Sequence, residues 1–89
     1  MEKITVKYSK RFLKQYYKLT PKLQHQFQLR LKLWQSDPYN VQLHLHMLTG
    51  EYAGLYSINI SGDIRALYEK IDNSYVIFGF IGTHSQLYG

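Results

Sequence analysis

The second half of the chain contains three apolar segments separated by two short turns, and this arrangement restricts the possible folds most strongly. Polar and apolar residues alternate from Leu55 to Ile60 and from Ile64 to Ile71, the period of two that is typical of β-strands. Ser61-Gly62-Asp63 joins these segments, and Asp72-Asn73 leads into Tyr75–Ile81, a strongly apolar stretch that we expect to be a central strand. Because such short turns connect neighbouring antiparallel strands, the pattern predicts an antiparallel meander.

The first half predicts one strand and two helices. Alternation over residues 4–8 indicates a short strand with one buried face, and Ser9 is a typical N-cap for a helix over residues 9–18. Thr20-Pro21 marks a second helix, because Thr caps helices and Pro is favoured at the first helical position. This helix should end near Gln35, ahead of Asp37-Pro38, since the residue before a proline disfavours helical backbone. Its apolar residues at helical spacing are expected in the core: Phe27, Leu31 and Trp34.

The element order is therefore β-α-α-β-β-β, which defines an α+β fold: an antiparallel sheet with a helical hairpin packed on one face. A chain of 89 residues without a repeat or a linker predicts a single domain, residues 1–89. The sequence has no Cys, and we see neither a secretory leader nor an apolar run that could span a membrane. We therefore expect a cytoplasmic protein without disulfides.

Positive charge is concentrated in the first 36 residues. Nine Lys and Arg stand there against one acidic residue, whereas residues 37–89 carry two basic and five acidic residues, so the two parts have net charges of +8 and −3. A basic half indicates an anionic partner, such as nucleic acid, an acidic protein segment or a membrane surface. The alternative is a solvated, lysine-rich helix face that binds nothing.

The second half holds residues suited to acid–base chemistry at a phosphate. Cleavage of RNA through its own 2′-hydroxyl, without a metal, needs a base, an acid and a cation beside the phosphate. Imidazole suits the first two roles near neutral pH, and guanidinium suits the third. His46 lies in the loop ahead of the meander, Arg65 lies within a strand, and His84 follows the last strand. These three residues are candidates for such a site.

Each candidate also has a simpler interpretation. Either histidine could be an ordinary surface or turn residue. Asp63 follows Gly62, and both residue types are common in turns. Arg65 could form a salt bridge with Asp63, Glu69 or Glu51.

Two further features have more than one interpretation. His44 and His46 have the spacing of two metal ligands on one strand face, but with no Cys and no third ligand nearby a metal site is not expected. Tyr88, close to the C-terminus, could stack on a base or could simply pack the tail against the domain.

Three motifs, in this order along the chain, resemble those of one protein family. His46-Met47-Leu48-Thr49-Gly50 is similar to a His-Pro-Leu-x-Gly pattern. Gly62-Asp63 ahead of Arg65-Ala66-Leu67-Tyr68 is similar to an Asp followed by an Arg-x-x-Tyr strand, and Gly82-Thr83-His84-Ser85-Gln86-Leu87-Tyr88-Gly89 is similar to Gly-Thr-His-x-x-Leu-Phe-Gly. Over essentially its whole length, the chain resembles the RelE/ParE superfamily of type II toxin–antitoxin toxins, and within it the YafQ-like branch.

This resemblance implies a ribosome-dependent mRNA endonuclease that works without a cofactor or a metal and inhibits translation. It also implies a hetero-oligomer with a cognate antitoxin, and no membrane partner. The positions that match catalytic residues are His46, Asp63, Arg65 and His84, and Tyr88 matches an aromatic residue that holds the substrate. The basic residues of the first helix are expected to contact RNA: Lys10, Arg11 and Lys14.

The chain departs from the YafQ-like pattern at three positions. It has Asn59 in place of a second His, Ile64 in place of a Trp, and Phe80 in place of an Arg. Arg65 could supply the missing positive charge from a neighbouring strand. Two alternatives stay open: a ParE-like inhibitor of DNA gyrase with the same fold, and a degenerate toxin that retains only antitoxin binding.

Overall fold

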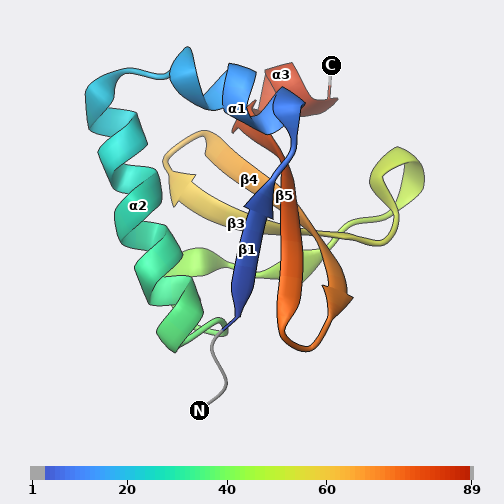
Figure 1. Cartoon of the computed structure of the whole chain (residues 1–89). Helices are drawn as coiled ribbons and strands as arrows, with labels where there is room; N and C mark the ends of the chain where they lie inside the picture. Colours follow the sequence, from blue (N-terminus) through green and yellow to red (C-terminus); the bar gives the residue numbers. More distant parts are fainter. Residues whose placement is uncertain (1–3, 89) are drawn as a thin grey trace.

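A computed structural model describes residues 4–88 (Figure 1). It contains the predicted strand, two helices and three strands in that order, with a two-residue strand, two 3-10 helices (η) and a short C-terminal helix in addition. The elements are β1 (Thr5–Tyr8), α1 (Lys10–Tyr17), α2 (Pro21–Ser36), η1 (Val41–Leu43), β2 (His46–Met47), η2 (Gly50–Tyr52), β3 (Leu55–Ser61), β4 (Ile64–Asp72), β5 (Tyr75–Thr83) and α3 (His84–Tyr88).

The sheet has five strands in the order β1-β5-β4-β3-β2. β3, β4 and β5 form the predicted antiparallel meander, and β2 extends it antiparallel to β3. β1 pairs with β5 in parallel, with Thr5 opposite Tyr75 and Tyr8 opposite Phe78, so the complete sheet is mixed. The apolar strand β5 is therefore interior, as its sequence indicates, but β4 is the middle strand of the sheet.

A β-bulge at Gly79 changes which residues of β5 face the core. The pairing with β4 skips Gly79, so that Phe78 and Phe80 lie opposite consecutive residues of β4. Ahead of the bulge, Phe78 belongs to the main core, and beyond it Ile81 does. Phe80 projects to the opposite face of the sheet, where it contacts the ring of Tyr52. One extra residue thus shifts the alternation of the strand by one position.

Both predicted helix starts are confirmed. Ser9 Oγ accepts a hydrogen bond from the Phe12 N–H at 3.0 Å, which caps α1. Thr20 Oγ1 accepts one from the Leu23 N–H at 3.2 Å, and Pro21 occupies the first position of α2. These caps satisfy N–H groups that have no partner inside the helix.

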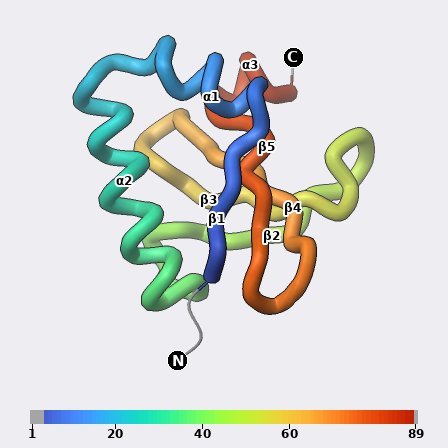
Figure 2. Tube along the Cα trace, in the orientation of Figure 1, coloured from blue at the N-terminus to red at the C-terminus, as the bar shows by residue number. Residues whose placement is uncertain are grey.

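Helix α1 covers the part of β5 that β1 leaves unpaired. Ser9 Oγ donates to the carbonyl of Gly79 at 2.9 Å, and the Ile81 N–H donates to Oε1 of Gln15 at 2.9 Å. These bonds replace a strand partner for β5, because a part-buried backbone group without a partner is costly. They also fix α1 at the end of β5 where α3 begins, and Figure 2 shows α1 and α3 at the same end of the molecule.

The main core lies between the helices and one face of the sheet and is rich in aromatic side chains. The three predicted core residues of α2 are buried: Phe27, Leu31 and Trp34. The ring of Phe12 packs on that of Phe27, with centroids 5.3 Å apart, and so joins α1 to α2. Burial of each large apolar side chain contributes about 1.5–3 kcal/mol. Trp34 Nε1 donates to the Tyr68 hydroxyl at 3.3 Å, so the buried indole N–H and the buried hydroxyl are each other's partners.

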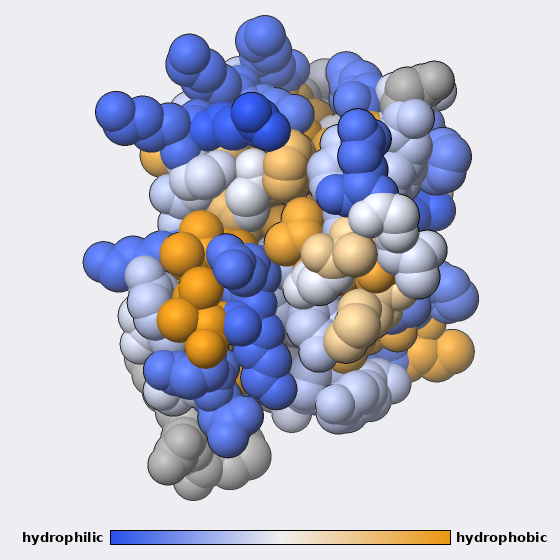
Figure 3. Space-filling view, turned by 90° about the vertical axis from the view of Figure 1, so that its right-hand side faces the viewer, coloured by the Kyte–Doolittle hydropathy of each residue, from blue (hydrophilic) through white to orange (hydrophobic). Residues whose placement is uncertain are grey.

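The surface mixes polar and apolar residues. On the face shown in Figure 3, apolar residues lie in separate groups between hydrophilic ones and do not form one continuous patch. Within residues 4–88, no helix is long and apolar enough to cross a membrane.

The hydrogen bond between Trp34 and Tyr68 gives a test of the core. Tyr68→Phe leaves the buried indole N–H without its acceptor, so we expect the free energy of unfolding to fall by about 1–3 kcal/mol. Urea denaturation measures this change. The matched control is Tyr17→Phe, since Tyr17 is 69% exposed, and a change within about 0.5 kcal/mol is expected there. Equal stabilities of the two variants would contradict the assigned role of the bond.

Candidate active site

One open hollow brings together four of the predicted site residues. It has a volume of about 330 Å³, and its lining consists of His44, His46, Leu48, Ser57, Arg65, His84 and Tyr88. Ser57 and Arg65 alternate along their strands with Ile58 and Ala66, which belong to the main core. Since successive side chains of a strand point to opposite faces, the hollow lies on the face of the sheet opposite the main core.

The backbone of the turn between β3 and β4 holds the guanidinium of Arg65. Its Nη1 donates to the carbonyl of Gly62 at 2.9 Å and to that of Ile64 at 3.3 Å, with a longer contact to Ser61. The partners that the described residues provide for Nη1 are thus carbonyl oxygens of the turn. Anchoring through one nitrogen keeps the positive charge at the hollow.

A reciprocal cap positions His84. The Gln86 N–H donates to Thr83 Oγ1 at 3.1 Å, and the Thr83 N–H donates to Gln86 Oε1 at 2.8 Å. This is a capping box at the start of α3, and it makes His84 the first residue of that helix. The ring of His84 lies against that of Tyr88, with centroids 4.7 Å apart. A short local motif therefore fixes two residues of the hollow.

His46 begins β2 and lies opposite Ser57 of β3. Its Nδ1 is 2.9 Å from the carbonyl oxygen of His44, and the two rings have centroids 5.1 Å apart. The sequence interpretation considered His44 only as a metal ligand, and the described residues contain no group of three such ligands arranged to hold a metal. The sequence signal that could have found His44 is its position two residues before His46.

Tyr88 closes the hollow from the side of α3. Its side chain is 37% exposed, and its ring packs edge-on against Tyr52. Burial raises the pKa of Tyr88 and the neighbouring phenol of Tyr52 acts in the same direction, while Ser57 and the positive charge of Arg65 lower this pKa. The Ser57 hydroxyl is buried and does not reach hydrogen-bond geometry with Tyr88 or with any other described residue. The lining of the hollow thus includes a buried hydroxyl that has no hydrogen-bond partner among the described residues.

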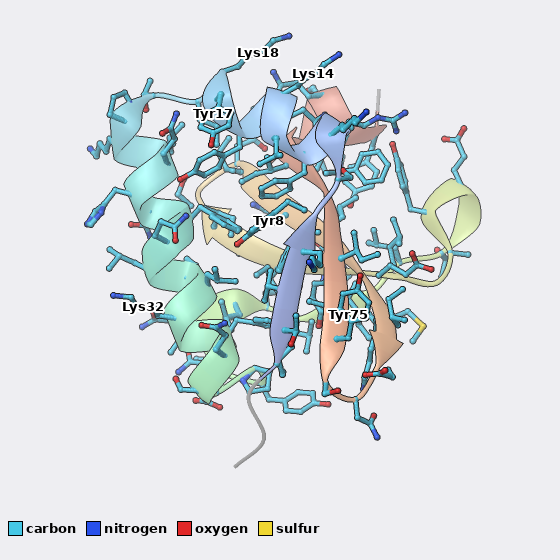
Figure 4. The ribbon with its side chains drawn as sticks, in the orientation of Figure 1. Tyr8, Lys14, Tyr17, Lys18, Lys32 and Tyr75 are labelled. Carbon is cyan, nitrogen blue, oxygen red and sulfur yellow. The ribbon has the colours of Figure 1, made fainter. Side chains whose placement is uncertain are left out.

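The remaining predicted residues lie outside this lining. Asp63 is exposed in the turn between β3 and β4, two residues before Arg65. Lys10, Arg11 and Lys14 are exposed on α1, and Figure 4 shows Lys14 extending from the helix away from the sheet. Arg11 is the one that approaches the site face, because its guanidinium carbon lies 5.0 Å from the ring centroid of Phe80.

Comparison with known families decides the class of the protein. The family model described as the bacterial toxin of type II toxin–antitoxin systems, YafQ, matches residues 4–89. The chain belongs to this family. Its α+β fold with a mixed five-stranded sheet is that of RelE-like toxins. None of the curated protein sequences matches the chain.

Solved structures of YafQ and related toxins share the fold. A crystal structure of YafQ from E. coli superposes with a TM-score of 0.79 and 21% identity, covering 97% of this chain and 99% of YafQ. The E. coli DinJ–YafQ toxin–antitoxin complex gives a TM-score of 0.76 at 22% identity, with 98% and 99% covered. The RelBE2 toxin–antitoxin complex of Mycobacterium tuberculosis gives 0.68 at 20% identity, with 92% and 99% covered. At these identities the likeness establishes the fold alone.

The structure gives a physical account of the three departures from the YafQ-like pattern. Ile64 is only 7% exposed and lies in the main core, so an apolar residue is retained there. Asn59 lies opposite Arg65, and its buried Oδ1 has no hydrogen-bond partner among the described residues. Because an amide does not titrate, Asn59 cannot replace a histidine in proton transfer. At Phe80, the guanidinium carbon of Arg11 lies 5.0 Å from the ring centroid, so α1 places a positive charge over the ring.

The capping box of α3 gives a second test. A Cβ at Gly82 would lie 2.8 Å from Gln86 Oε1, so Gly82→Ala should displace the Gln86 side chain and open the cap. We expect faster hydrogen exchange at the amide of Thr83, measured by NMR. Gly79→Ala on the same strand is the control, because a Cβ there meets no atom within 4 Å. If the Thr83 amide exchanges equally slowly in both variants, the hydrogen bond from Thr83 to Gln86 does not require a glycine at position 82.

Proposed function

We propose that this YafQ-family toxin is a ribosome-dependent mRNA endonuclease that cleaves through the 2′-hydroxyl of its substrate. The observation that carries the proposal is the position of His46, Arg65 and His84 in the lining of one open hollow. Two imidazoles and a guanidinium are the groups that this reaction needs at neutral pH. An open hollow also suits a chain as bulky as single-stranded RNA.

The proposed reaction balances with the two histidines alone. One imidazole takes the proton of the 2′-hydroxyl while the 2′-oxygen forms a bond to phosphorus. The bond from phosphorus to the 5′-oxygen breaks, and the second imidazole gives its proton to that oxygen. The products are a 2′,3′-cyclic phosphate and a 5′-hydroxyl end. Arg65 stabilises the negative charge that accumulates on the phosphate oxygens in the transition state.

The other predicted residues have supporting roles in this proposal. Tyr88, partly exposed beside His84, offers a ring face on which a base can stack. Asp63 lies two residues before Arg65 at the exposed turn, and the geometry supports a catalytic role for it less directly than for the histidines. Lys10, Arg11 and Lys14 would contact phosphates of the messenger or of ribosomal RNA.

An antitoxin is the expected protein partner. The toxins of the DinJ–YafQ and RelBE2 structures were solved in complex with an antitoxin. We propose that this chain is neutralised in the same way, in a hetero-oligomer. The net charge of +8 on residues 1–36 is complementary to an acidic segment that folds on binding.

The role of His84 can be tested in a translation extract. We expect the wild-type chain to cut translated mRNA. His84→Ala should cut it at least about a hundredfold more slowly, since one proton-transfer group is lost. His25→Ala is the control, because His25 is exposed on α2 and outside the hollow. Equal cutting by wild type and His84→Ala would remove His84 from the mechanism. Intact mRNA together with inhibition of DNA gyrase supercoiling would favour the ParE-like alternative.

The role of Arg11 can be tested by the salt dependence of RNA binding. Log affinity for RNA falls as log salt concentration rises. If Arg11 contacts a phosphate, Arg11→Ala should make this slope shallower by about 0.7 for a single strand. Fluorescence anisotropy with an uncleavable 2′-O-methyl oligonucleotide measures this slope. Lys32→Ala is the matched control, because Lys32 points outward from α2, away from the sheet (Figure 4). Identical slopes for both variants would mean that Arg11 contacts no phosphate.

A further inference from the structure

We propose that His44 is a positioning residue: its left-handed backbone aims its carbonyl at His46 Nδ1, so that His46 exchanges protons only through Nε2. The inference rests on the proposed function for its catalytic meaning, but its structural part can be tested without any RNA. His44 is the one described residue other than glycine that has a positive φ.

The backbone at His44 has φ 46° and ψ 48°, the left-handed conformation that side chains with a Cβ rarely adopt. His44 ends the 3-10 helix η1, and its N–H donates to the carbonyl of Val41. Leu45 follows, and β2 begins at His46. Sparsely populated backbone conformations of this kind persist where the surroundings hold them, and they concentrate at functional sites.

The hydrogen bond that results fixes the protonation of one ring nitrogen. A carbonyl oxygen can only accept, so the contact of 2.9 Å between the His44 carbonyl and His46 Nδ1 requires a proton on Nδ1. Neutral His46 then carries its lone pair on Nε2. Protonated His46 carries a second proton on Nε2, and that proton is the one it can release. In either role in the cleavage, Nε2 is the nitrogen that meets the substrate.

The neighbours of His46 come from every element around the hollow. The ring of His44 lies 5.1 Å away, Ser57 faces it from β3, Arg65 is contributed by β4, and α3 contributes His84 and Tyr88. Among these groups, the His44 carbonyl is the one that accepts a hydrogen bond from His46 Nδ1. Without it, the imidazole could turn or exchange tautomers, and an N–H would stand where the reaction needs a lone pair.

The experiment uses three substitutions that separate backbone from side chain. His44→Gly and His44→Asn keep a carbonyl at this position and tolerate the left-handed conformation, whereas His44→Val disfavours it because Val is β-branched. Two-bond ¹⁵N–¹H correlation spectra of the full chain, at mildly alkaline pH, report which nitrogen of His46 carries the proton. We expect the form with the proton on Nδ1 in wild type, His44→Gly and His44→Asn, and a mixture of tautomers in His44→Val.

Cleavage assays complete the test. We expect His44→Val to cut at least about tenfold more slowly than His44→Asn. A His46 with its proton on Nε2 has no lone pair there to take the proton of the 2′-hydroxyl. A wild-type His46 with its proton on Nε2 would overturn the inference, as would His44→Val with the same spectra and the same rate as His44→Asn. If His44→Val does not fold, the spectra of wild type and of His44→Gly still decide. Expected spectra without any RNA cleavage would refute the proposed function and support the positioning of His46.

Discussion

The alternation of side chains along β3, β4 and β5 is the constraint on which both the core and the candidate site depend. Residues such as Ile58 and Ala66 enter the main core, so their neighbours Ser57 and Arg65 must project from the other face. The bulge at Gly79 keeps this division consistent on β5, because Phe78 and Ile81 can then both face the core. One sheet thus has one face in the main core under the helices and an opposite face on which Ser57 and Arg65 line the hollow.

Short local motifs hold the functional groups at the hollow. Carbonyls of the turn between β3 and β4 anchor Arg65, and the capping box of Thr83 and Gln86 positions His84. The carbonyl of His44 orients His46. Each group is therefore fixed by backbone atoms or by a residue close in sequence.

Much of the fold could be predicted because its signals are local. Ser9 and Thr20 mark helix starts through hydrogen bonds within three residues, and Pro21 marks one through its fixed φ. The burial of Trp34 follows from helical spacing. The parallel pairing of β1 with β5 could not be predicted this way, because it joins segments about 70 residues apart and leaves no periodic pattern. Ser9 and Gln15 bind backbone groups of β5 beyond the segment that β1 pairs with, so these bonds depend on that pairing.

For the site, the motifs already identify the available side chains: two histidines, an arginine and a tyrosine near the C-terminus, in patterns similar to those of YafQ-like toxins. The folded chain is needed to show that His46, Arg65, His84 and Tyr88 share one hollow. It also shows that His44 joins them and that Asp63 lies outside the lining. The physical reason is that motifs record neighbours along the chain. The distance between two side chains on different strands is set by strand order, register and bulges, which arise when the whole sheet packs against its core.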